Sequence, residues 1–359
     1  MIQIPNLRVV LTLLLCGSAH SGFAQEPPSL APAPAEPKID PIVQLHEAIS
    51  GKVEQTQLDL YQKSALSVAM LERTTGEGTE IGCGFFVDDE GTFVTVLSTA
   101  GDTVQMKVHY GGREFLPKLL TMDPYTRLAI LKLDGVNAPG LDITPSRSME
   151  VGDFMIAVAE TREEGNRCTI GRLAGREKNF DGIPLAATLL RLNLTAKPGC
   201  FGAPLVNLEG EVSGIVLLSV TAEEGVSYAL PSELIEKVRR DYEKHGRVQP
   251  SWLGVGLAQG TTTPSIVSLS EDSPAKQAGL LPGDVIRSIG GRQIQEYQDV
   301  VDACYYLTAG ETVPIRVMRG LEDLEVEVVP SLRSERPDTP VPPGLQGAEE
   351  AGEADVEAP

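Results

Sequence analysis

The chain has 359 residues, with 30 lysines and arginines against 50 acidic residues, a net charge of −20 and 42% hydrophobic residues. This profile indicates a globular protein of about two domains. The acidic excess provides no basic surface for a phosphate backbone and argues against nucleic-acid binding. The four histidines form no i,i+4 pair and the sequence lacks a CxxC motif, so we expect neither a metal site nor a cofactor.

Residues 1–24 have the features of a secretory signal peptide, which we expect to be cleaved after Ala24. Arg8 supplies the positive charge, and the apolar stretch that follows is shorter than the roughly 20 residues that span a bilayer. An uncleaved anchor is the weaker alternative, and so is a lipoprotein, because Leu15 rather than a small residue precedes Cys16. The sequence therefore predicts an exported protein, periplasmic or secreted, with no membrane span after cleavage and with disulfides allowed.

The predicted mature chain begins with two short segments outside the main domains. Residues 25–41 are rich in Pro and Ala and are expected to form an extended linker. Residues 42–61 have helical periodicity, which Ser50 and Gly51 interrupt.

Two folded modules are expected after residue 61. Residues 62–231 contain many short runs of Val, Leu, Ile and Thr between turn residues, which is typical of a β-barrel or β-sandwich. A linker helix is expected within residues 232–250, with Ser232 as its N-cap and Gly246 at its end. Residues 251–333 mix strands with helices at 274–278 and 297–307, and the acidic tail at 334–359 is expected to be disordered.

Three segments in fixed order resemble the exported HtrA (DegP-type) serine proteases: GCGFFVDDEGTFVT at 82–95, DPYTRLAILKLDG at 123–135 and KPGCFGAPLVNLEGEVSGIV at 197–216. The C-terminal module resembles the PDZ domain of that family through WLGV at 252–255 and SPAKQAGLLPGDVIRSIGGRQI at 273–294. The resemblance implies a mostly β fold, in which a chymotrypsin-like pair of six-stranded β-barrels is followed by an α+β PDZ domain.

The resemblance also locates the Ser-His-Asp triad of the family, in which serine attacks, histidine takes its proton and aspartate orients the histidine. Ser98 stands at the histidine position, Arg127 at the aspartate position and Phe201 at the nucleophile position. None of these side chains can perform the role of the residue it replaces. The resemblance therefore implies a pseudoprotease with no catalytic residues.

Cys200 is adjacent to the former nucleophile position and is the alternative nucleophile. A thiolate needs a nearby base or cation, and His109 and His245 are poorly placed to serve. A disulfide or a buried thiol is the preferred interpretation. In the family's fold the strand that carries Cys83 packs close to the nucleophile loop, so a Cys83–Cys200 disulfide is expected, with Cys168 as the rival partner.

Two further interpretations concern the former catalytic cleft. Arg127 and Lys197 could bind an anion, although solvated or locally paired side chains are the simpler explanation. Phe201 either fills the cleft as a plug or is simply buried on the barrel.

A PDZ domain binds a partner's C-terminus as an added strand, and the amides of a tight loop hold the terminal carboxylate. The groove is expected between residues 255–259 and the helix at 297–307. The stretch after WLGV is short, which limits the edge strand, and a vestigial groove is the alternative. The expected peptide-binding residues, with Cys304 as a further candidate for the floor, are Trp252, Leu253, Gly254, Val255, Leu257 and Val301.

The sequence thus predicts a catalytically inactive HtrA-like protein that acts in envelope protein quality control as a PDZ-mediated peptide-binding scaffold or regulator. Its expected partners are C-terminal or unfolded peptides of envelope proteins, and homo-oligomers or hetero-oligomers with HtrA-type proteases. Two alternatives are an endopeptidase that uses Cys200 and a regulatory subunit of an active HtrA protease.

Overall fold

The computed structural model describes residues 54–75, 78–97, 105–162, 165–180, 183–197, 199–219, 225–258 and 263–332. The predicted signal peptide, the Pro/Ala-rich linker, most of the helical segment at 42–61 and the acidic tail lie outside the described residues. Within the described part of the chain, no helix has both the length and the apolar character needed to cross a membrane.

A helix over residues 54–65 precedes the first strand, so it continues past the predicted end at residue 61. Leu60 is buried in the same hydrophobic core as the β-sheets that follow. The Ser64 hydroxyl donates a hydrogen bond to the Leu60 carbonyl at 2.8 Å. The helix therefore packs on the β-domain through its last turns.

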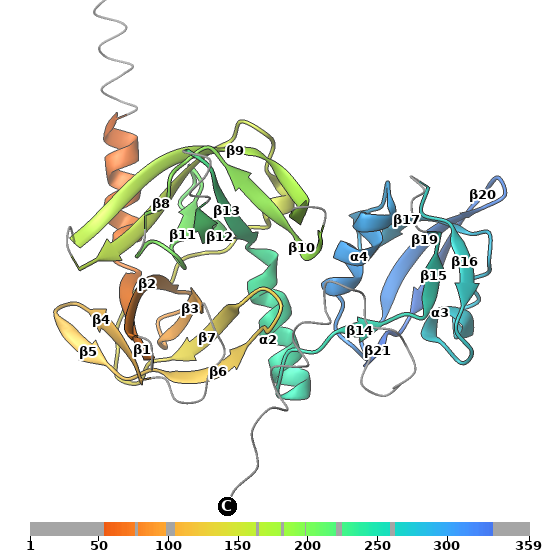
Figure 1. The fold of residues 1–359 in the computed structure, drawn as a ribbon, viewed down its shortest axis with the longest axis horizontal. Helices are drawn as coiled ribbons and strands as arrows, with labels where there is room; N and C mark the ends of the chain where they lie inside the picture. Colours follow the sequence, from red (N-terminus) through yellow and green to blue (C-terminus); the bar gives the residue numbers. More distant parts are fainter. Residues whose placement is uncertain are drawn as a thin grey trace, which may run out of the picture. The chain divides into compact units, whose positions relative to one another are not determined.

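The first sheet has seven strands in the order β5-β4-β1-β2-β3-β7-β6, and every pairing is antiparallel (Figure 1). Phe86 and Phe93 pack edge to face at its centre, with ring centroids 5.1 Å apart. The strand pairings leave this sheet open, whereas the resemblance implied a closed six-stranded barrel. The strands are β1 Val68–Thr75, β2 Gly78–Phe86, β3 Thr92–Val96, β4 Gln105–Tyr110, β5 Arg113–Phe115, β6 Lys118–Met122 and β7 Leu128–Lys132.

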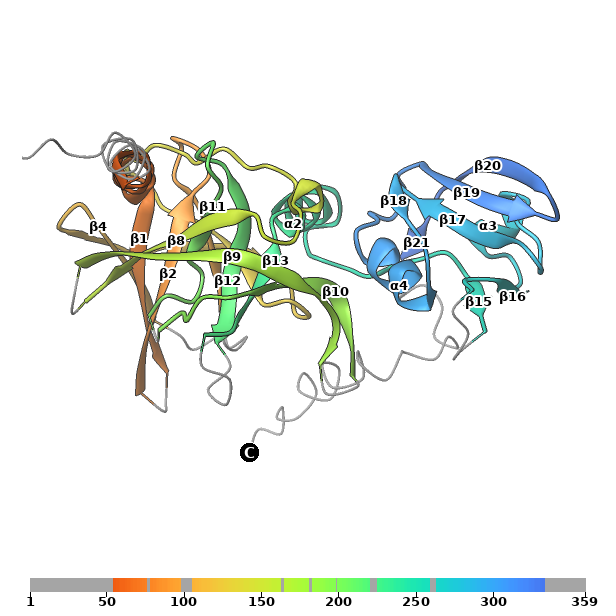
Figure 2. The same cartoon turned by 90° about the horizontal axis from the view of Figure 1, so that it is seen from above.

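The second sheet closes into a six-stranded barrel in the order β10-β13-β12-β11-β8-β9, as expected. Figure 2 shows β9 and β10 as a long antiparallel pair. Both sheets contribute to one hydrophobic core, in which Phe85 of β2 and Leu190 of β10 are fully buried. The strands, preceded by the short 3₁₀ helix η1 at Ser146–Ser148, are β8 Phe154–Thr161, β9 Gly165–Phe180, β10 Ile183–Leu192, β11 Pro204–Val206, β12 Val212–Ser219 and β13 Ser227–Pro231.

Helix α2, Glu233–His245, follows the barrel and packs on β6 and β7. Gly246 ends it at φ 74°, and its amide donates to the Tyr242 carbonyl, as predicted for a glycine in the left-handed region. The predicted side-chain cap at Ser232 is wrong. Ser232 has a helical backbone (φ −61°, ψ −28°) rather than the extended backbone of a capping residue, so its hydroxyl accepts no cap hydrogen bond and donates to the Thr144 carbonyl at 2.5 Å.

The C-terminal module has its own core, built mainly around Ile286, Ile289, Ile315 and Val317. Its main sheet has the order β18-β17-β19-β20, and α4 packs beside β17. Two small pairs, β14-β21 and β15-β16, complete it. The elements are β14 Ser251–Trp252, β15 Val255–Leu257, β16 Ile266–Leu269, α3 Pro274–Gln277, β17 Val285–Ile289, β18 Arg292–Gln293, α4 Tyr297–Tyr305, β19 Val313–Arg319, β20 Glu322–Val328 and β21 Ser331–Leu332.

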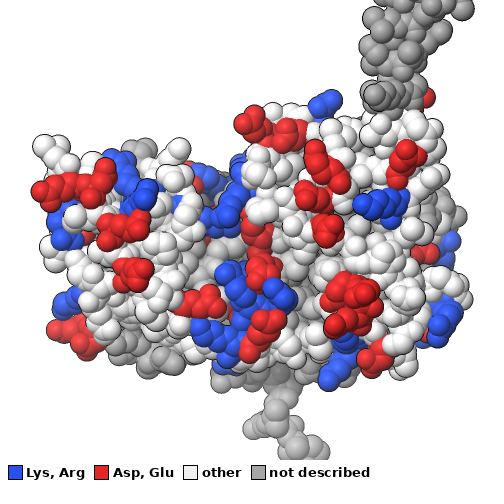
Figure 3. All heavy atoms as spheres, turned by 180° about the vertical axis from the view of Figure 1, so that it is seen from behind, with Lys and Arg blue, Asp and Glu red and all other residues white. Residues whose placement is uncertain are grey.

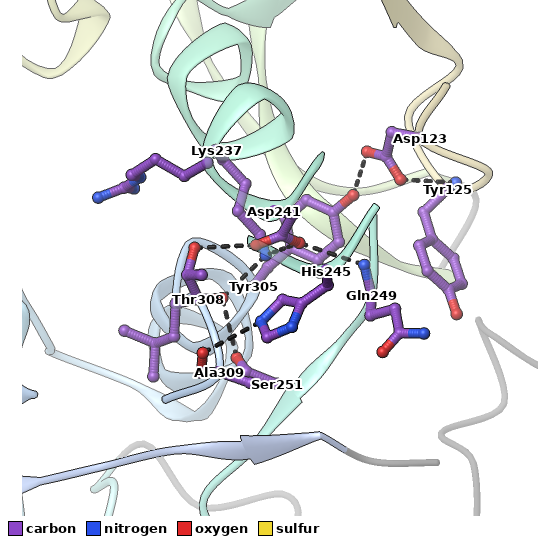
Figure 4. A network of polar contacts seen from close by, with 12 residues as sticks. Asp123, Tyr125, Lys237, Asp241, His245, Gln249, Ser251, Tyr305, Thr308 and Ala309 are labelled. Carbon is purple, nitrogen blue, oxygen red and sulfur yellow. Dashed lines mark hydrogen bonds and ion pairs between the residues drawn. The ribbon is translucent and has the colours of Figure 1, made fainter. Parts of the chain in front are cut away.

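A buried polar network joins α2 to the segment after α4 (Figure 4). Lys237 and Asp241, one helical turn apart, form an ion pair whose side chains are each 1% exposed. The Lys237 ammonium also donates to the Leu307 carbonyl at 2.8 Å, and the Thr308 hydroxyl donates to Asp241 at 2.8 Å. Burial lowers the pKa of Lys237. Hydrogen bonds of these buried polar groups thus connect the C-terminal module to α2.

Candidate functional site

The loop before β11 contains the former nucleophile position and is held against β2 by backbone contacts. The Cys83 amide donates to the Phe201 carbonyl at 2.8 Å, and the Gly202 amide donates to the Val216 carbonyl at 2.8 Å. Gly202 has φ 91°, and a Cβ atom there would lie 2.1 Å from the Cys83 carbonyl oxygen. Only glycine fits such a position, so the shape of this loop depends on Gly202.

A cavity of about 500 Å³ lies between this loop and the first sheet. Arg127 and Phe201, which the resemblance assigns to two of the three triad positions, both line it. Phe201 is half-buried and packs against the shared core, which is compatible with both earlier interpretations of this residue. Ser98 lies outside the described residues. The lining residues are Leu71, Arg73, Glu80, Ile81, Gly82, Val96, Leu97, Arg127, Gly199, Phe201 and Leu217.

Arg127 has an unusual backbone, with φ 66°. Its amide donates to the Asp123 carbonyl at 2.9 Å, and its carbonyl accepts from the Leu97 amide at 3.0 Å. These bonds fix a left-handed conformation that is unfavourable for a side chain other than Gly, Asn or Asp. Lys197, the other candidate for anion binding, is exposed and does not line the cavity.

The two histidines of the described chain have other partners. His109 lies on β4, with its Nε2 atom 3.3 Å from Glu72. The His245 Nε2 atom lies 3.1 Å from the Ala309 carbonyl oxygen (Figure 4). Neither lines the cavity that contains Phe201.

All four cysteines of the described chain are free thiols in the structure. Cys83 and Cys200 are both buried, and burial raises the pKa of Cys83 to about 12. Burial, with the Asp302 carboxylate adding to it, also raises the pKa of Cys304 to about 12. Cys168 is exposed on β9. The Cys83–Cys200 pairing is therefore not formed here and stays a prediction for the oxidised protein.

Asp123 is buried and serves as an anchor between the two modules. Its carboxylate accepts hydrogen bonds from the Thr126 hydroxyl, from the Tyr125 amide at 3.0 Å, and from the Tyr305 hydroxyl of α4 (Figure 4). Burial raises the pKa of Asp123 despite these donors. The sequence analysis assigned no role to Asp123, and it missed Tyr305, which carries no motif.

The expected carboxylate-binding loop has the shape that a PDZ domain needs. Gly254 has φ 77°, and a Cβ atom there would lie 2.2 Å from the Ser273 Cβ atom. The Leu253 carbonyl accepts from the Ala275 amide at 3.0 Å, and the Gly254 carbonyl accepts from the Ser270 amide at 2.9 Å. Since the C=O and N–H of a peptide unit point in opposite directions, the amides of Gly254 and Val255 face away from these donors.

The expected groove residues divide into two groups. Trp252 and Leu253 are buried, whereas Val255, Leu257 and Val301 are half-buried. Val255 and Leu257, together with Cys304, pack against the core of the module. Strand β15 ends at Leu257, two residues before the predicted end at 259, so the strand available for pairing with a peptide is short.

Residue types that could hold a metal are not clustered within the described ranges, where no group of three or more His, Cys, Asp or Glu side chains comes together. On the face drawn in Figure 3, acidic and basic side chains of the described residues alternate over the surface. Such a surface does not favour a strongly charged macromolecular partner on that face.

Comparison with known protein families matches both modules. A trypsin-like peptidase domain matches residues 82–215, and a PDZ domain matches residues 251–329. The described fold therefore belongs to the class of trypsin-like peptidase domains joined to a PDZ domain.

Similar proteins include a probable periplasmic serine endoprotease, DegP-like, from Pseudomonas putida strain W619, 28% identical over 68% of this chain and 54% of that protein. Another is the mitochondrial serine protease HTRA2 of Bos taurus, 28% identical over 76% of this chain and 67% of that protein. The chain spans about half the length of the DegP-like relatives it matches.

Solved structures give the same result. The HtrA-type protease AlgW with tripeptide superposes with a TM-score of 0.59 at 25% identity, covering 77% of this chain and 97% of that one. The serine endoprotease from Yersinia pestis gives 0.51 at 25% identity, covering 76% and 96%. The chain is thus an HtrA-like family protein.

Proposed function

We propose that this chain is an exported HtrA-like protein that does not cleave peptide bonds and that binds peptide C-termini through its PDZ domain. Its setting is protein quality control in the cell envelope, as a scaffold or regulator. The features of residues 1–24 and the relatives named as periplasmic support export.

The observation that carries the proposal is the pair of side chains in the cleft. Arg127 and Phe201 line one cavity at the positions where the family has an aspartate and a serine. An arginine has no acceptor atom and cannot orient an imidazole by accepting a hydrogen bond from its N–H, and a phenylalanine has no nucleophilic atom. The described histidines are bonded elsewhere, so the described part of the cavity lining contains no general base of that kind.

The proposed binding site is the loop at Gly254 with the adjoining strand β15. The amides of Gly254 and Val255, which face away from the Ala275 and Ser270 donors, suit a terminal carboxylate, and the half-buried Val255 and Leu257 suit an apolar peptide side chain. The short β15 limits the number of main-chain hydrogen bonds. We therefore expect modest affinity for single peptides, which the proposed homo-oligomers or hetero-oligomers would raise through avidity.

Cleavage is tested with the purified chain from residue 25, an unfolded protein substrate and mass spectrometry of the products. We expect no fragments under conditions in which an active DegP-like relative degrades the substrate completely. The matched variant is Cys200→Ala, which removes the alternative nucleophile. Fragments produced by the wild-type chain and absent with this variant would overturn the proposed inactivity.

Binding is tested on the same protein with a library of peptides that have free C-terminal carboxylates. Each binding peptide is compared with its C-terminal amide, which should bind at least tenfold more weakly because the loop amides lose a charged acceptor. Equal affinity for the acid and the amide would contradict the proposed use of this loop.

A further inference from the structure

The cavity at the former catalytic position has a chemical character that proteolysis does not explain. Six apolar side chains surround it, namely Leu71, Ile81, Val96, Leu97, Phe201 and Leu217. Its volume, about 500 Å³, lies within the range of small-molecule sites. The space is therefore large enough for a ligand and is mostly apolar.

Three charged side chains also line this cavity, and two of them neutralise each other. The Arg73 guanidinium is buried, with its side chain 5% exposed, and lies 3.4 Å from the Glu80 carboxylate. Arg127 makes no ion pair and its side chain makes no hydrogen bond within the described part of the chain. Among the described residues that line the cavity, Arg127 is therefore the positive charge without an ion pair.

Arg127 is also held in place at an energetic cost. Its left-handed backbone is fixed by the Asp123 carbonyl and the Leu97 amide, and a residue with a Cβ atom adopts this conformation only with strain. Strained residues that the surrounding structure holds in place are concentrated at ligand sites.

We propose that this cavity binds a carboxylate that carries an apolar chain. A guanidinium pairs with a carboxylate through two parallel hydrogen bonds, and an apolar lining accommodates the attached chain. The carboxylate could belong to a fatty acid or to a peptide with an apolar C-terminal residue. This site is separate from the PDZ groove and goes beyond the proposed function.

The test is calorimetric titration of the chain from residue 25 with sodium octanoate. We expect saturable binding of one octanoate, and at least tenfold weaker binding for acetate, which lacks the apolar chain, and for octanol, which lacks the charge. In a second arm the ligand is an N-acetylated tetrapeptide ending in leucine. That arm uses a Gly254→Ala background, in which the PDZ loop is disabled.

The critical variant is Arg127→Asn, because asparagine tolerates a left-handed backbone and removes the charge. We expect it to fold like the wild type and to bind octanoate at least tenfold more weakly, whereas Arg127→Lys should retain part of the affinity. Phe201→Glu, which puts a carboxylate into the cavity, should also abolish binding if its circular dichroism is unchanged.

The two titrations show whether the site exists and which carboxylate it binds. Binding of octanoate alone, or of the peptide alone, supports the site and identifies the source of the carboxylate. Binding of neither ligand, or equal octanoate affinity in the wild type and in Arg127→Asn, would overturn the proposal. Since the readout is binding at a site outside the PDZ loop, failure here leaves the proposed peptide binding untouched, and the converse also holds.

Discussion

At the scale of single residues, buried polar side chains that belong to no sequence motif help to hold the fold together. Lys237 and Asp241 are fully buried and are satisfied by each other, by the Leu307 carbonyl and by the Thr308 hydroxyl. A buried ion pair of this kind adds little net stability, but loss of one partner leaves a charge without compensation.

We therefore predict that Asp241→Asn lowers the free energy of unfolding by about 3–5 kcal/mol. Urea denaturation monitored by circular dichroism measures the change. The double variant Lys237→Met with Asp241→Leu should recover most of the loss, because neither charge remains buried. A double variant as unstable as the single one would contradict this explanation.

Asp284 provides a pH-dependent prediction. Hydrogen bonds from the Arg319 guanidinium, at 2.7 and 2.8 Å, lower the pKa of the Asp284 carboxyl below its ordinary value of 3.8. A lowered pKa in the folded state means that this stabilisation is complete above about pH 4 and is lost as the pH falls through the folded-state pKa.

We accordingly expect Asp284→Asn to be less stable than the wild type by about 2 kcal/mol between pH 5 and pH 7. The difference should shrink between about pH 4 and pH 2, as the wild-type carboxyl becomes protonated. Thermal denaturation of both proteins across this range is the measurement. A difference that stays constant down to pH 2 would count against the proposed role of the ion pair.

At the scale of elements, the sequence predicted both helices of the C-terminal module to within two residues at their ends. The residue patterns left a β-barrel or a β-sandwich open for the N-terminal module, and the second barrel followed from the family resemblance. The open order of the first sheet, the 16-residue strand β9 and the role of Ser232 could not be predicted. These features depend on which segments meet in three dimensions, and local propensity does not contain that information.

In the candidate sites, too, local motifs identified some residues, whereas contacts between distant parts of the chain could not be predicted. Arg127 and Phe201, which the motifs singled out, line one cavity, and the WLGV segment contains a left-handed glycine. The contact between Asp123 and Tyr305 joins residues 182 positions apart. That neither of the described histidines, His109 and His245, lines the cavity with Phe201 depends on where the fold carries them.

For the loop element we predict that Gly254→Ala weakens peptide binding at least tenfold. Its Cβ atom would lie 2.2 Å from the Ser273 Cβ atom, so the loop must move. The matched control is Gly279→Ala, which has a similar φ of 87° but has no atom within 4 Å of the new Cβ atom. Fluorescence anisotropy with a labelled C-terminal peptide measures the affinity of both variants. An equal loss of affinity in both would show that backbone strain, rather than the contact with Ser273, weakens binding.

At the scale of the whole molecule, the two modules share a bonded contact. The Thr188 amide of β10 donates to the Asp302 carboxylate of α4 at 2.6 Å, and Lys178 of β9 pairs with Glu296 and Asp299 at 2.6 Å. Tyr306, at the end of α4, is buried in the core of the β-domain. Unfolding of one module therefore removes hydrogen bonds and packing contacts from the other module.

We predict that the chain from residue 25 unfolds in a single calorimetric transition. The combined variant Asp302→Ala with Tyr305→Phe should separate this transition into two. The first should lie several degrees below the wild-type transition, since each kcal/mol of unfolding free energy lost lowers the midpoint by about 2–4 °C. Two transitions already present in the wild type would show that the contact is too weak to couple the modules.

The buried network around Lys237 has a practical consequence for where the C-terminal module can be cut from the chain. A fragment that begins at Ser251 loses both Lys237 and Asp241 and exposes the Leu307 carbonyl and the Thr308 hydroxyl to water. The smallest fragment that keeps these bonds begins before α2, so the helix between the modules belongs structurally to both of them.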